Sequence, residues 1–411
     1  MRRTQMIAFS IVLVAIVIVQ PSGFASDPQT VQWLQTSGFN IYDESGQTFD
    51  LHGVNLTYGA GQPLTPADIQ AVKALGFNSI RVNNVYWGLI QPYNESSQGI
   101  DVQYLVTGIS TPLRGVHPPI PPLDYVVNLA VQQNVYVVIC LYAWTGYYPP
   151  PQWAFPAISH SGNNQVWMDG GAASLRAYSG VFNGTAAKER TGLINTWRFI
   201  ADRYKDIPNV VFELLNEPLV PDASLAGNYY KTFNEQVISA IESVETRSHL
   251  KLIPLLRNAV EEEITGQSVD VSKSNVVWVS HIYAPMNNWD PNGNYWHDSF
   301  TWHGKYLPKG YGNGTTFVAW KLVSVAAKIH SWNRPWMNTE FAKQVTQTYW
   351  KSWFKIVMDT MTEQQIAGWQ YYSYSLDPSK DAGWNIKDPS TQAQVIPVLQ
   401  DYLGQLHPMR R

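Results

Sequence analysis

The chain has 411 residues, of which 45% are hydrophobic and 13% aromatic, so it can build a sizeable core and is not an intrinsically disordered protein. Lysine and arginine number 28 against 31 aspartate and glutamate residues, which gives a net charge of -3. Because there is neither a positive excess nor a basic run, we expect no nucleic-acid partner. The 17 Trp and 23 Tyr residues, in a chain only 14% charged, favour a flat polar ligand instead.

The first 26 residues have the layout of a secretory signal. Arg2 and Arg3 precede an apolar run over residues 6–19, and small residues follow. That run is shorter than the roughly 20 residues needed to span a bilayer. We therefore expect a secreted, extracellular protein with a mature domain over residues 27–411, and an uncleaved membrane anchor as the alternative.

From residue 38 onward, short apolar strands alternate with helical stretches. A small hairpin is predicted over residues 38–46, with a turn at residues 43–46. Eight candidate strands follow in chain order, at residues 49–56, 79–82, 135–141, 210–214, 251–255, 276–281, 336–338 and 367–371. Repeated strand and helix imply a parallel sheet covered by helices.

Two of the intervening helices carry clear signals. Thr65 followed by Pro66 is typical of a helix start, and Gly76 is typical of its end. Farther along, apolar residues recur with the period of a helix that buries one face, namely Leu193, Trp197, Ile200 and Tyr204. We therefore expect an α/β fold, a (β/α)8 TIM barrel with long βα loops, in a single domain.

Three long irregular stretches are predicted at residues 108–122, 144–184 and 284–314. In a barrel they would follow strands at the face that carries the active site. They are rich in aromatic residues, which include Trp144, Tyr147, Tyr148, Trp153, Trp289, Trp296 and Trp302. Exposed rings can stack on pyranose units, so a polysaccharide cleft is predicted. The alternative is that these rings pack the loops onto the barrel.

The sequence gives little support to metal, thiol or serine chemistry. The chain has one cysteine, Cys140, so an intramolecular disulfide is excluded, and its apolar neighbours predict a small buried residue. His297 and His303 form the one close pair among nine His residues, and no His-Glu-x-x-His occurs. The serine-hydrolase pattern Gly-x-Ser-x-Gly is missing as well. We expect neither a metal nor a cofactor.

Two glutamates each follow a predicted strand directly. Glu217 stands in Asn216-Glu217-Pro218, and Glu340 lies just past the strand at residues 336–338. Barrel strands end at one face, so both carboxyl groups are expected at the barrel mouth. A glycosidase needs one carboxyl group that donates a proton and an ionised one that attacks the anomeric carbon. A single glutamate at a strand end is more often a surface residue than a catalytic one. The residues around each glutamate therefore decide between these two interpretations.

Over residues 38–403 the chain resembles glycoside hydrolase family 5, the cellulase-type branch of the retaining (β/α)8 glycosidases. Six segments in the family's order carry the resemblance: Leu51-His-Gly-Val-Asn-Leu56, Asn78-Ser-Ile-Arg-Val82, Phe212-Glu-Leu-Leu-Asn-Glu-Pro218, His281-Ile-Tyr283, Asn338-Thr-Glu340 and Gly368-Trp-Gln-Tyr-Tyr372. A single short segment such as Asn-Glu-Pro can arise by chance, whereas six at family spacing are hard to explain in that way.

The resemblance implies that Glu217 is the catalytic acid/base and Glu340 the nucleophile. It also implies that Arg81 and Tyr283 lie beside Glu340, where a cation and a hydroxyl donor favour the ionised carboxylate. A low-dielectric site near a second negative charge would raise the pKa of Glu217. An ordinary ion pair between Arg81 and Glu213 is the alternative for that arginine, and Glu213 itself is interpreted as structural.

Further residues are implied to contact the sugar. Asn216 would bond the 2-OH, and His281 would complete the sugar-binding wall. Two positions depart from the family pattern, because Tyr142 stands where many members have His and Tyr372 where many have Trp. Trp369 is the substitute stacking residue if the register of the last strand differs, and Trp144 and Trp289 are candidate loop contacts.

Together these features predict a secreted, monomeric, endo-acting enzyme that hydrolyses β-1,4-linked glucan with net retention. A β-mannanase or another β-glycosidase of the same family, including one that acts on glycoconjugates, is the nearest alternative. Single hydroxyl contacts separate these substrates, and loop conformations decide such contacts. A carbohydrate-binding protein on an inactive barrel is the alternative from another class.

Overall fold

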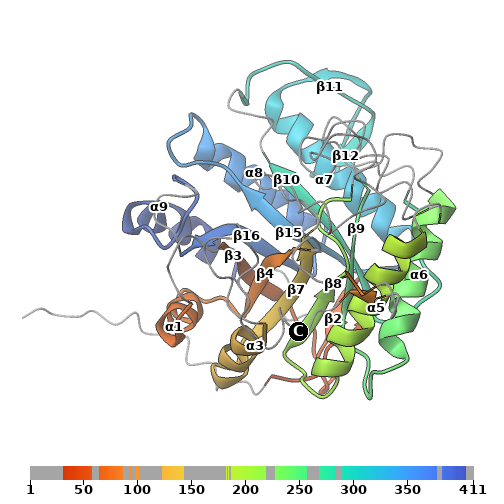
Figure 1. The fold of residues 1–411 in the computed structure, drawn as a ribbon. Helices are drawn as coiled ribbons and strands as arrows, with labels where there is room; N and C mark the ends of the chain where they lie inside the picture. Colours follow the sequence, from red (N-terminus) through yellow and green to blue (C-terminus); the bar gives the residue numbers. More distant parts are fainter. Residues whose placement is uncertain are drawn as a thin grey trace, which may run out of the picture. The chain divides into compact units, whose positions relative to one another are not determined.

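Eight parallel strands close into a barrel in the computed structural model (Figure 1). The structure describes residues 31–57, 64–86, 93–94, 99–100, 123–142, 182, 184, 187–218, 227–256, 268–283, 289–376 and 382–403. The barrel strands are β3 (Leu51–Thr57), β4 (Ser79–Tyr86), β7 (Tyr136–Tyr142), β8 (Val210–Glu213), β9 (Lys251–Pro254), β10 (Val276–Tyr283), β15 (Trp336–Ala342) and β16 (Gly368–Ser375). They follow one another around the barrel in chain order, which confirms the predicted (β/α)8 fold.

Helices lie around the outside of the strands (Figure 1). Those that the described residues contain are α1 (Pro66–Ala74), α3 (Leu123–Gln132), α5 (Ala187–Tyr204), α6 (Gly227–Glu242), α7 (Gly314–His330), α8 (Trp350–Glu363) and α9 (Pro389–Gln400). Thr65 caps α1 as predicted, because its side chain accepts from the backbone N–H of Asp68 while Asp68 bonds back to Thr65. The periodic apolar face of α5 is buried throughout, which confirms that helix.

A short hairpin closes the N-terminal end of the barrel. Its strands β1 (Gln35–Ser37) and β2 (Asn40–Tyr42) are antiparallel, and a second turn at residues 43–47 follows as predicted. Leu34 and Ile41 are buried against residues of the barrel interior. Asn275, just before β10, accepts from the N–H of Thr36 at 3.0 Å and donates to the carbonyl of Leu34 at 3.1 Å. The hairpin therefore forms the floor of the barrel.

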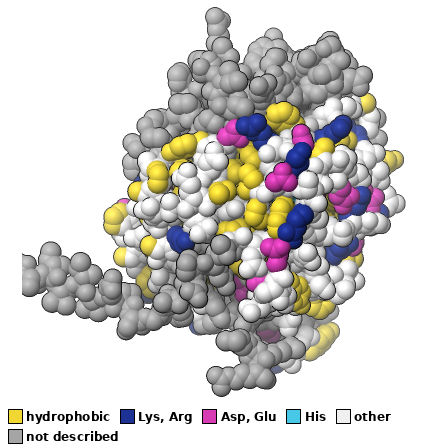
Figure 2. Space-filling model, turned by 90° about the horizontal axis from the view of Figure 1, so that it is seen from below, with side chains coloured by type: hydrophobic (Ala, Val, Ile, Leu, Met, Phe, Trp, Pro, Cys, Tyr) yellow, Lys and Arg dark blue, Asp and Glu magenta, His cyan; other side chains and the backbone are white. Residues whose placement is uncertain are grey.

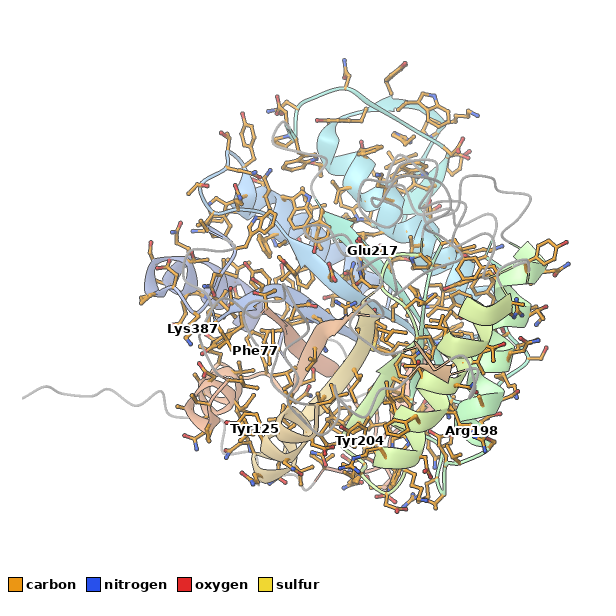
Figure 3. The ribbon with its side chains drawn as sticks, viewed as in Figure 1. Phe77, Tyr125, Arg198, Tyr204, Glu217 and Lys387 are labelled. Atoms are coloured by element: carbon orange, nitrogen blue, oxygen red, sulfur yellow. The ribbon has the colours of Figure 1, made fainter. Side chains whose placement is uncertain are left out.

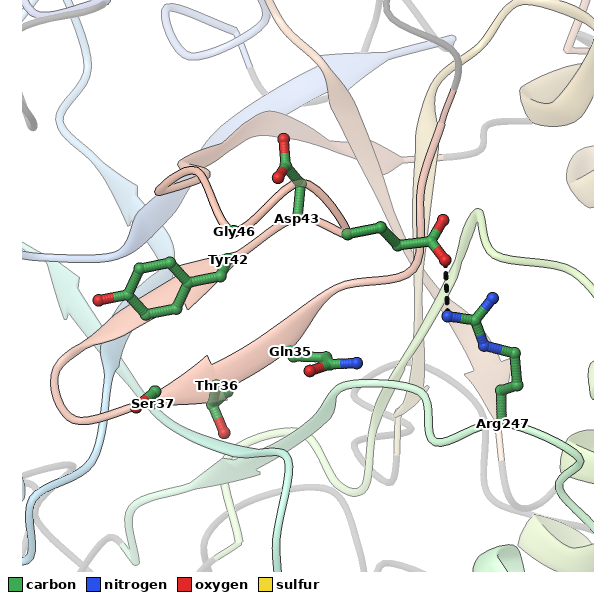
Figure 4. Close-up of a pocket in the computed structure, with 8 residues that line it drawn as sticks. Gln35, Thr36, Ser37, Tyr42, Asp43, Gly46 and Arg247 are labelled. Carbon is green, nitrogen blue, oxygen red and sulfur yellow. Dashed lines mark hydrogen bonds and ion pairs between the residues drawn. The ribbon is translucent and has the colours of Figure 1, made fainter.

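A polar pocket lies on this hairpin (Figure 4). It is lined by Gln35, Thr36, Ser37, Tyr42, Asp43, Glu44, Gly46 and Arg247. Arg247 donates to Glu44 at 2.6 Å across its rim. Because the pocket is at the N-terminal end of the strands, it lies opposite the face on which TIM barrels build active sites.

The stretch predicted as irregular at residues 284–314 contains regular structure, so that prediction was wrong in part. β11 (Tyr295–His297) pairs with β14 (Gly310–Gly312), and β12 (Phe300–Trp302) pairs with β13 (Lys305–Leu307). A further short pair joins β5 (Tyr93–Asn94) and β6 (Gly99–Ile100). Where β14 approaches α7, a Cβ at Gly312 would lie 2.2 Å from the hydroxyl oxygen of Thr316 and 2.6 Å from Nε2 of His297, so a larger residue would have to displace these side chains.

The surface seen from below shows basic and acidic side chains next to each other rather than gathered by sign (Figure 2). Described ion pairs include Arg203 with Asp124 and Lys205 with Asp202. In the described part of the chain, every helix is too short or too polar to cross a membrane. The predicted signal segment, residues 1–26, lies outside the described residues.

Candidate active site

Glu217 lies just past the C-terminal end of β8, near the centre of the view in Figure 3. Arg198 and Tyr204, which the same figure labels, lie on α5 at the periphery. The backbone of Glu217 has φ 39°, a left-handed conformation that is rare outside glycine. Such strain persists only where the surroundings hold it, and it is concentrated at functional sites.

The structure brings the two predicted glutamates together. One carboxylate oxygen of Glu217, one of Glu340 and a ring nitrogen of His281 all lie within 4.8 Å of one another. Nδ1 of His281 is 2.9 Å from Oε1 of Glu217 and 3.7 Å from Oε2 of Glu340. Tyr283 donates its hydroxyl to that same Oε2 at 2.6 Å. These residues come from β8, β10 and β15, so their meeting is a consequence of barrel closure.

Arg81 on β4 is fully buried and bonds both predicted partners at once. Its Nη1 donates to Glu340 at 2.5 Å, while Nε and Nη2 donate to the two oxygens of Glu213 at 2.5 and 2.8 Å. The contact with Glu340 and the ion pair with Glu213, which were predicted as alternatives for Arg81, are therefore both present in the structure. Nη2 also lies 3.1 Å from Sγ of Cys140, which is buried as expected. Burial raises the pKa of the Cys140 thiol well above its usual range.

Electrostatics in this cluster favour a charged imidazole. Burial alone lowers the pKa of His281, but the negative charges of Glu340, Glu213 and Glu217 outweigh it and raise that pKa to about 9. For Glu213, burial raises the pKa, but the Arg81 charge and the His281 imidazole, whose Nε2 lies 3.9 Å away, outweigh it, so the pKa is lowered. The described site thus brings the buried Arg81 guanidinium, and a buried imidazole whose pKa is raised, against three carboxyl groups.

Asn216 holds an unused donor beside the glutamates. Its Oδ1 accepts from Arg81 at 2.8 Å, and its backbone N–H donates to the carbonyl of Leu141 at 3.0 Å. Within the described residues, its buried Nδ2 has no hydrogen-bond partner. A buried donor left unpaired costs about 1–3 kcal/mol, so this group is available to a bound hydroxyl.

Two aromatic predictions need correction. Trp369 is fully buried between β16 and the outer layer, with its ring near those of Phe77 and Phe341 at 5.9 and 5.8 Å, so no sugar can stack on it here. Trp289 is 2% exposed and donates to the carbonyl of Gly314, so it packs its loop onto the barrel, which was the stated alternative.

The remaining aromatic predictions fall in different places. Tyr372 is half-buried within β16, with its ring 6.2 Å from that of Tyr283. The backbone of Tyr142 ends β7, but its side chain and all of Trp144 lie outside the described residues.

Two residues that the sequence analysis missed also contact this cluster. Thr339 lies between His281 and Glu213, with its hydroxyl oxygen 3.0 Å from Nε2 and 3.1 Å from Oε1 respectively. Trp384 reaches the site from the segment after β16, with its ring 5.8 Å from that of Tyr372. Thr339 stands next to the predicted nucleophile in the sequence, which was the available signal. Nothing in the sequence marked Trp384.

The same three side chains could each offer one atom to a cation. Arg81 and a protonated His281 already bring positive charge to Glu217 and Glu340, and a metal ion would have to displace it. The arrangement therefore fits proton transfer and nucleophilic attack by carboxyl groups.

Comparison with known proteins identifies the family of this fold and site. Residues 42–377 match the family described as Cellulase (glycosyl hydrolase family 5). A 133-residue segment is 29% identical to Endoglucanase 3 of Fibrobacter succinogenes, and covers 31% of this chain and 20% of that relative. The chain therefore spans about a fifth of the length of this curated relative.

Solved structures show the same fold. The catalytic domain of the major endoglucanase from Xanthomonas campestris pv. campestris superposes with a TM-score of 0.57 at 15% identity, over 90% of this chain and all of that one, 100%. An endogalactoceramidase gives a TM-score of 0.58 at 20% identity, over 88% of this chain and 78% of that one. Because the family match covers most of the residues that form the barrel, the chain belongs to glycosyl hydrolase family 5 and is a glycoside hydrolase.

Proposed function

We propose that this glycoside hydrolase is a secreted, endo-acting enzyme that cleaves β-1,4-linked glucan with net retention. The observation that carries the proposal is the approach of Glu217 and Glu340 oxygens to within 4.8 Å. Retaining glycosidases hold their two carboxyl groups about 5–5.5 Å apart, whereas inverting enzymes keep them roughly 6.5–9.5 Å apart to admit a water. The closer spacing favours direct attack by one carboxylate.

In the proposed first step, Glu217 donates its proton to the glycosidic oxygen while Glu340 attacks the anomeric carbon. Arg81 and Tyr283 each donate a hydrogen bond to Glu340, so a cation and a hydroxyl donor hold the carboxylate that makes the attack. The bond between the anomeric carbon and the glycosidic oxygen breaks, the protonated aglycone leaves as an alcohol, and a glycosyl ester forms on Glu340. In the second step, Glu217 takes a proton from water, and that water cleaves the ester with the original configuration restored.

The unpaired Nδ2 of Asn216 supports a contact with the sugar 2-OH. Hydrogen bonds to that hydroxyl strengthen in the oxocarbenium-like transition state. A glucan substrate is favoured because the curated relative is named an endoglucanase. The structural neighbour named endogalactoceramidase makes a glycoconjugate the second candidate substrate.

The test compares the parent enzyme with the Glu217→Gln and Glu340→Gln variants. Both variants should lose about three orders of magnitude or more in kcat while still binding oligosaccharide, because the shape of the site is kept and its proton donor or nucleophile is lost. Arg198→Gln, on the exposed side of α5, is the control and should retain parental kcat. Parental turnover by either glutamine variant would refute the assigned roles.

Substrate and stereochemistry are read from the parent enzyme. A panel of soluble β-glucan, β-mannan, xylan and galactosylceramide ranks the substrates by kcat/KM. Proton NMR of the first product then shows its anomeric configuration, for which we expect retention. Faster hydrolysis of mannan or of the glycolipid would replace the glucan assignment, and an inverted first product would exclude double displacement.

A further inference from the structure

A continuous series of hydrogen bonds runs through the barrel interior from Arg81 to Glu217. Arg81 donates two bonds to Glu213, and Thr339 donates its hydroxyl to Oε1 of Glu213 at 3.1 Å. Nε2 of His281 lies 3.0 Å from the Thr339 oxygen, and Nδ1 lies 2.9 Å from Oε1 of Glu217. The predicted acid/base is therefore linked to the buried ion pair through one hydroxyl and one imidazole.

Donor and acceptor counting assigns the proton on Nε2. Glu213 is fully buried, and both of its oxygens accept from one edge of the Arg81 guanidinium, through Nε and Nη2, so it is ionised and can only accept. Thr339 has one hydroxyl hydrogen, and the contact with Glu213 uses it. The Thr339 oxygen must then accept from His281, which requires a hydrogen on Nε2. With Nε2 occupied, only Nδ1 can gain or lose a proton.

We propose that Thr339 is a positioning residue whose hydroxyl holds His281 in the form protonated on Nε2, so that Nδ1 alone titrates and shares one proton with Glu217. The inference rests on the proposed role of Glu217 and deepens it. When Glu217 gives its proton to the leaving group, the carboxylate that forms faces Nδ1 at hydrogen-bond distance. The His281–Glu217 pair thus takes up and releases protons as a unit.

The groups that face His281 determine whether its pKa rises or falls when the Thr339 hydroxyl is removed. Glu213, on β8, and Glu217, just after β8, both face His281, and Glu340 faces it from β15. Tyr283, two residues after His281 on β10, donates its hydroxyl to Glu340. Arg81, from β4, is bonded to two of these carboxylates. The three carboxylates favour the imidazolium, whose Nε2–H needs the Thr339 oxygen as its acceptor. Loss of that acceptor disfavours the charged form, so the pKa of His281 must fall.

The experiment is an NMR titration of the whole protein labelled with 15N-histidine. The His281 signals are assigned by their absence in His281→Gln and by their displacement in Glu217→Gln. Above its titration, His281 of the parent protein should show the nitrogen shifts of the Nε2–H tautomer. Thr339→Val, which replaces the hydroxyl by a methyl group of similar size, should lower the pKa of His281 by about one pH unit. Thr339→Ser keeps the hydroxyl and should leave that pKa in place.

Thr339→Ala is a second variant without the hydroxyl, in case the valine protein folds poorly. An Nδ1–H tautomer in the parent protein would overturn the proposal, and so would equal His281 pKa values in the valine and serine variants. Where activity is measurable, the alkaline limb of kcat/KM should move to lower pH in the valine variant only. An inactive parent enzyme would count against the proposed function, while the titration would still decide the role of Thr339.

Discussion

At the scale of single residues, Arg81 is a buried cation that pairs with two carboxylates at once. It is fully buried and lies between Glu213 and Glu340, of which the first is also fully buried. Attraction across such a pair offsets the large cost of taking the charges out of water only while both partners are present. Removal of one partner leaves an uncompensated buried charge, so the arginine is needed for stability as well as for its hydrogen bond to Glu340.

Arg81→Met should therefore lower the free energy of unfolding by about 3–5 kcal/mol at pH 7. The loss should be smaller at about pH 4, because the buried carboxyl group of Glu213, left without its cation in the variant, can then take up a proton and become neutral. Urea denaturation at the two pH values measures both effects. Arg198→Met, an exposed arginine on α5, should change stability by no more than about 0.5 kcal/mol. Equal losses in the two variants would contradict this role for Arg81.

At the scale of elements, a bulge in β15 explains how consecutive residues reach the same interior. Ser280 pairs with Asn338 and His281 with Glu340, so Thr339 is an extra residue on β15. The pairing with β16 shifts at the same place. Side chains alternate between the two faces of a regular strand, which would turn Thr339 outward. A bulge re-aims side chains and is common next to active sites.

The segment that carries Trp384 is held in place by strand β16. The carbonyl of Trp384 accepts from the hydroxyl of Tyr371 at 2.7 Å, and the side chain of Asn385 bonds both the N–H and the carbonyl of Ser375. The indole lies 6.3 Å from the ring of Tyr283, whose hydroxyl bonds Glu340. A half-buried ring fixed at this position is suited to contact the sugar that Glu340 attacks.

We expect Trp384→Leu to lower kcat/KM about tenfold, because stacking of an aromatic ring contributes roughly 1–1.5 kcal/mol. Trp332→Leu is the matched control, since Trp332 is also half-buried but packs on Trp278, with a ring separation of 4.8 Å, just before β15. Both proteins should be assayed on the same oligosaccharide after their thermal midpoints are compared. Similar kcat/KM values in the two variants would argue against a substrate contact by Trp384.

At the scale of the whole barrel, the apolar floor and the polar candidate site lie at opposite ends. The N-terminal end is closed by the β1–β2 hairpin and an apolar cluster that includes Leu34 and Ile41. The C-terminal ends of β8, β10 and β15 carry the polar cluster around Glu217 and Glu340. This division is the general plan of TIM barrels, in which loops at one face act while the other face stabilises.

Ile41→Ala should consequently lower the free energy of unfolding without lowering the catalytic rate of the folded protein. The side chain is 0% exposed, so its truncation should cost about 2–4 kcal/mol through lost burial and the cavity that remains. The kcat/KM of the folded variant should stay within about twofold of the parent value. Chemical denaturation and steady-state kinetics at a temperature where both proteins are folded give the two quantities. A large fall in kcat/KM in the folded variant would show that the floor and the site are coupled.

The sequence by itself determined the barrel and the two glutamates at its mouth. Alternating apolar strands and periodic helices are local signals, and a parallel closed barrel places every strand end at one face. The resemblance to the family, rather than local pattern, placed Arg81 and Tyr283 beside Glu340 and added His281 to the same site.

Only the tertiary structure decided the contacts that depend on exact register or on packing between distant segments. The bulge that turns Thr339 inward, the burial of Trp369 and Trp289, and the approach of Trp384 to Tyr283 leave no periodic signal in the sequence. A one-residue shift reverses the face of a side chain, and burial of a ring depends on neighbours far along the chain. Local pattern therefore located the strands, although it ended the one that carries Glu340 at residue 338 whereas β15 continues to Ala342, and barrel closure determined which side chains meet.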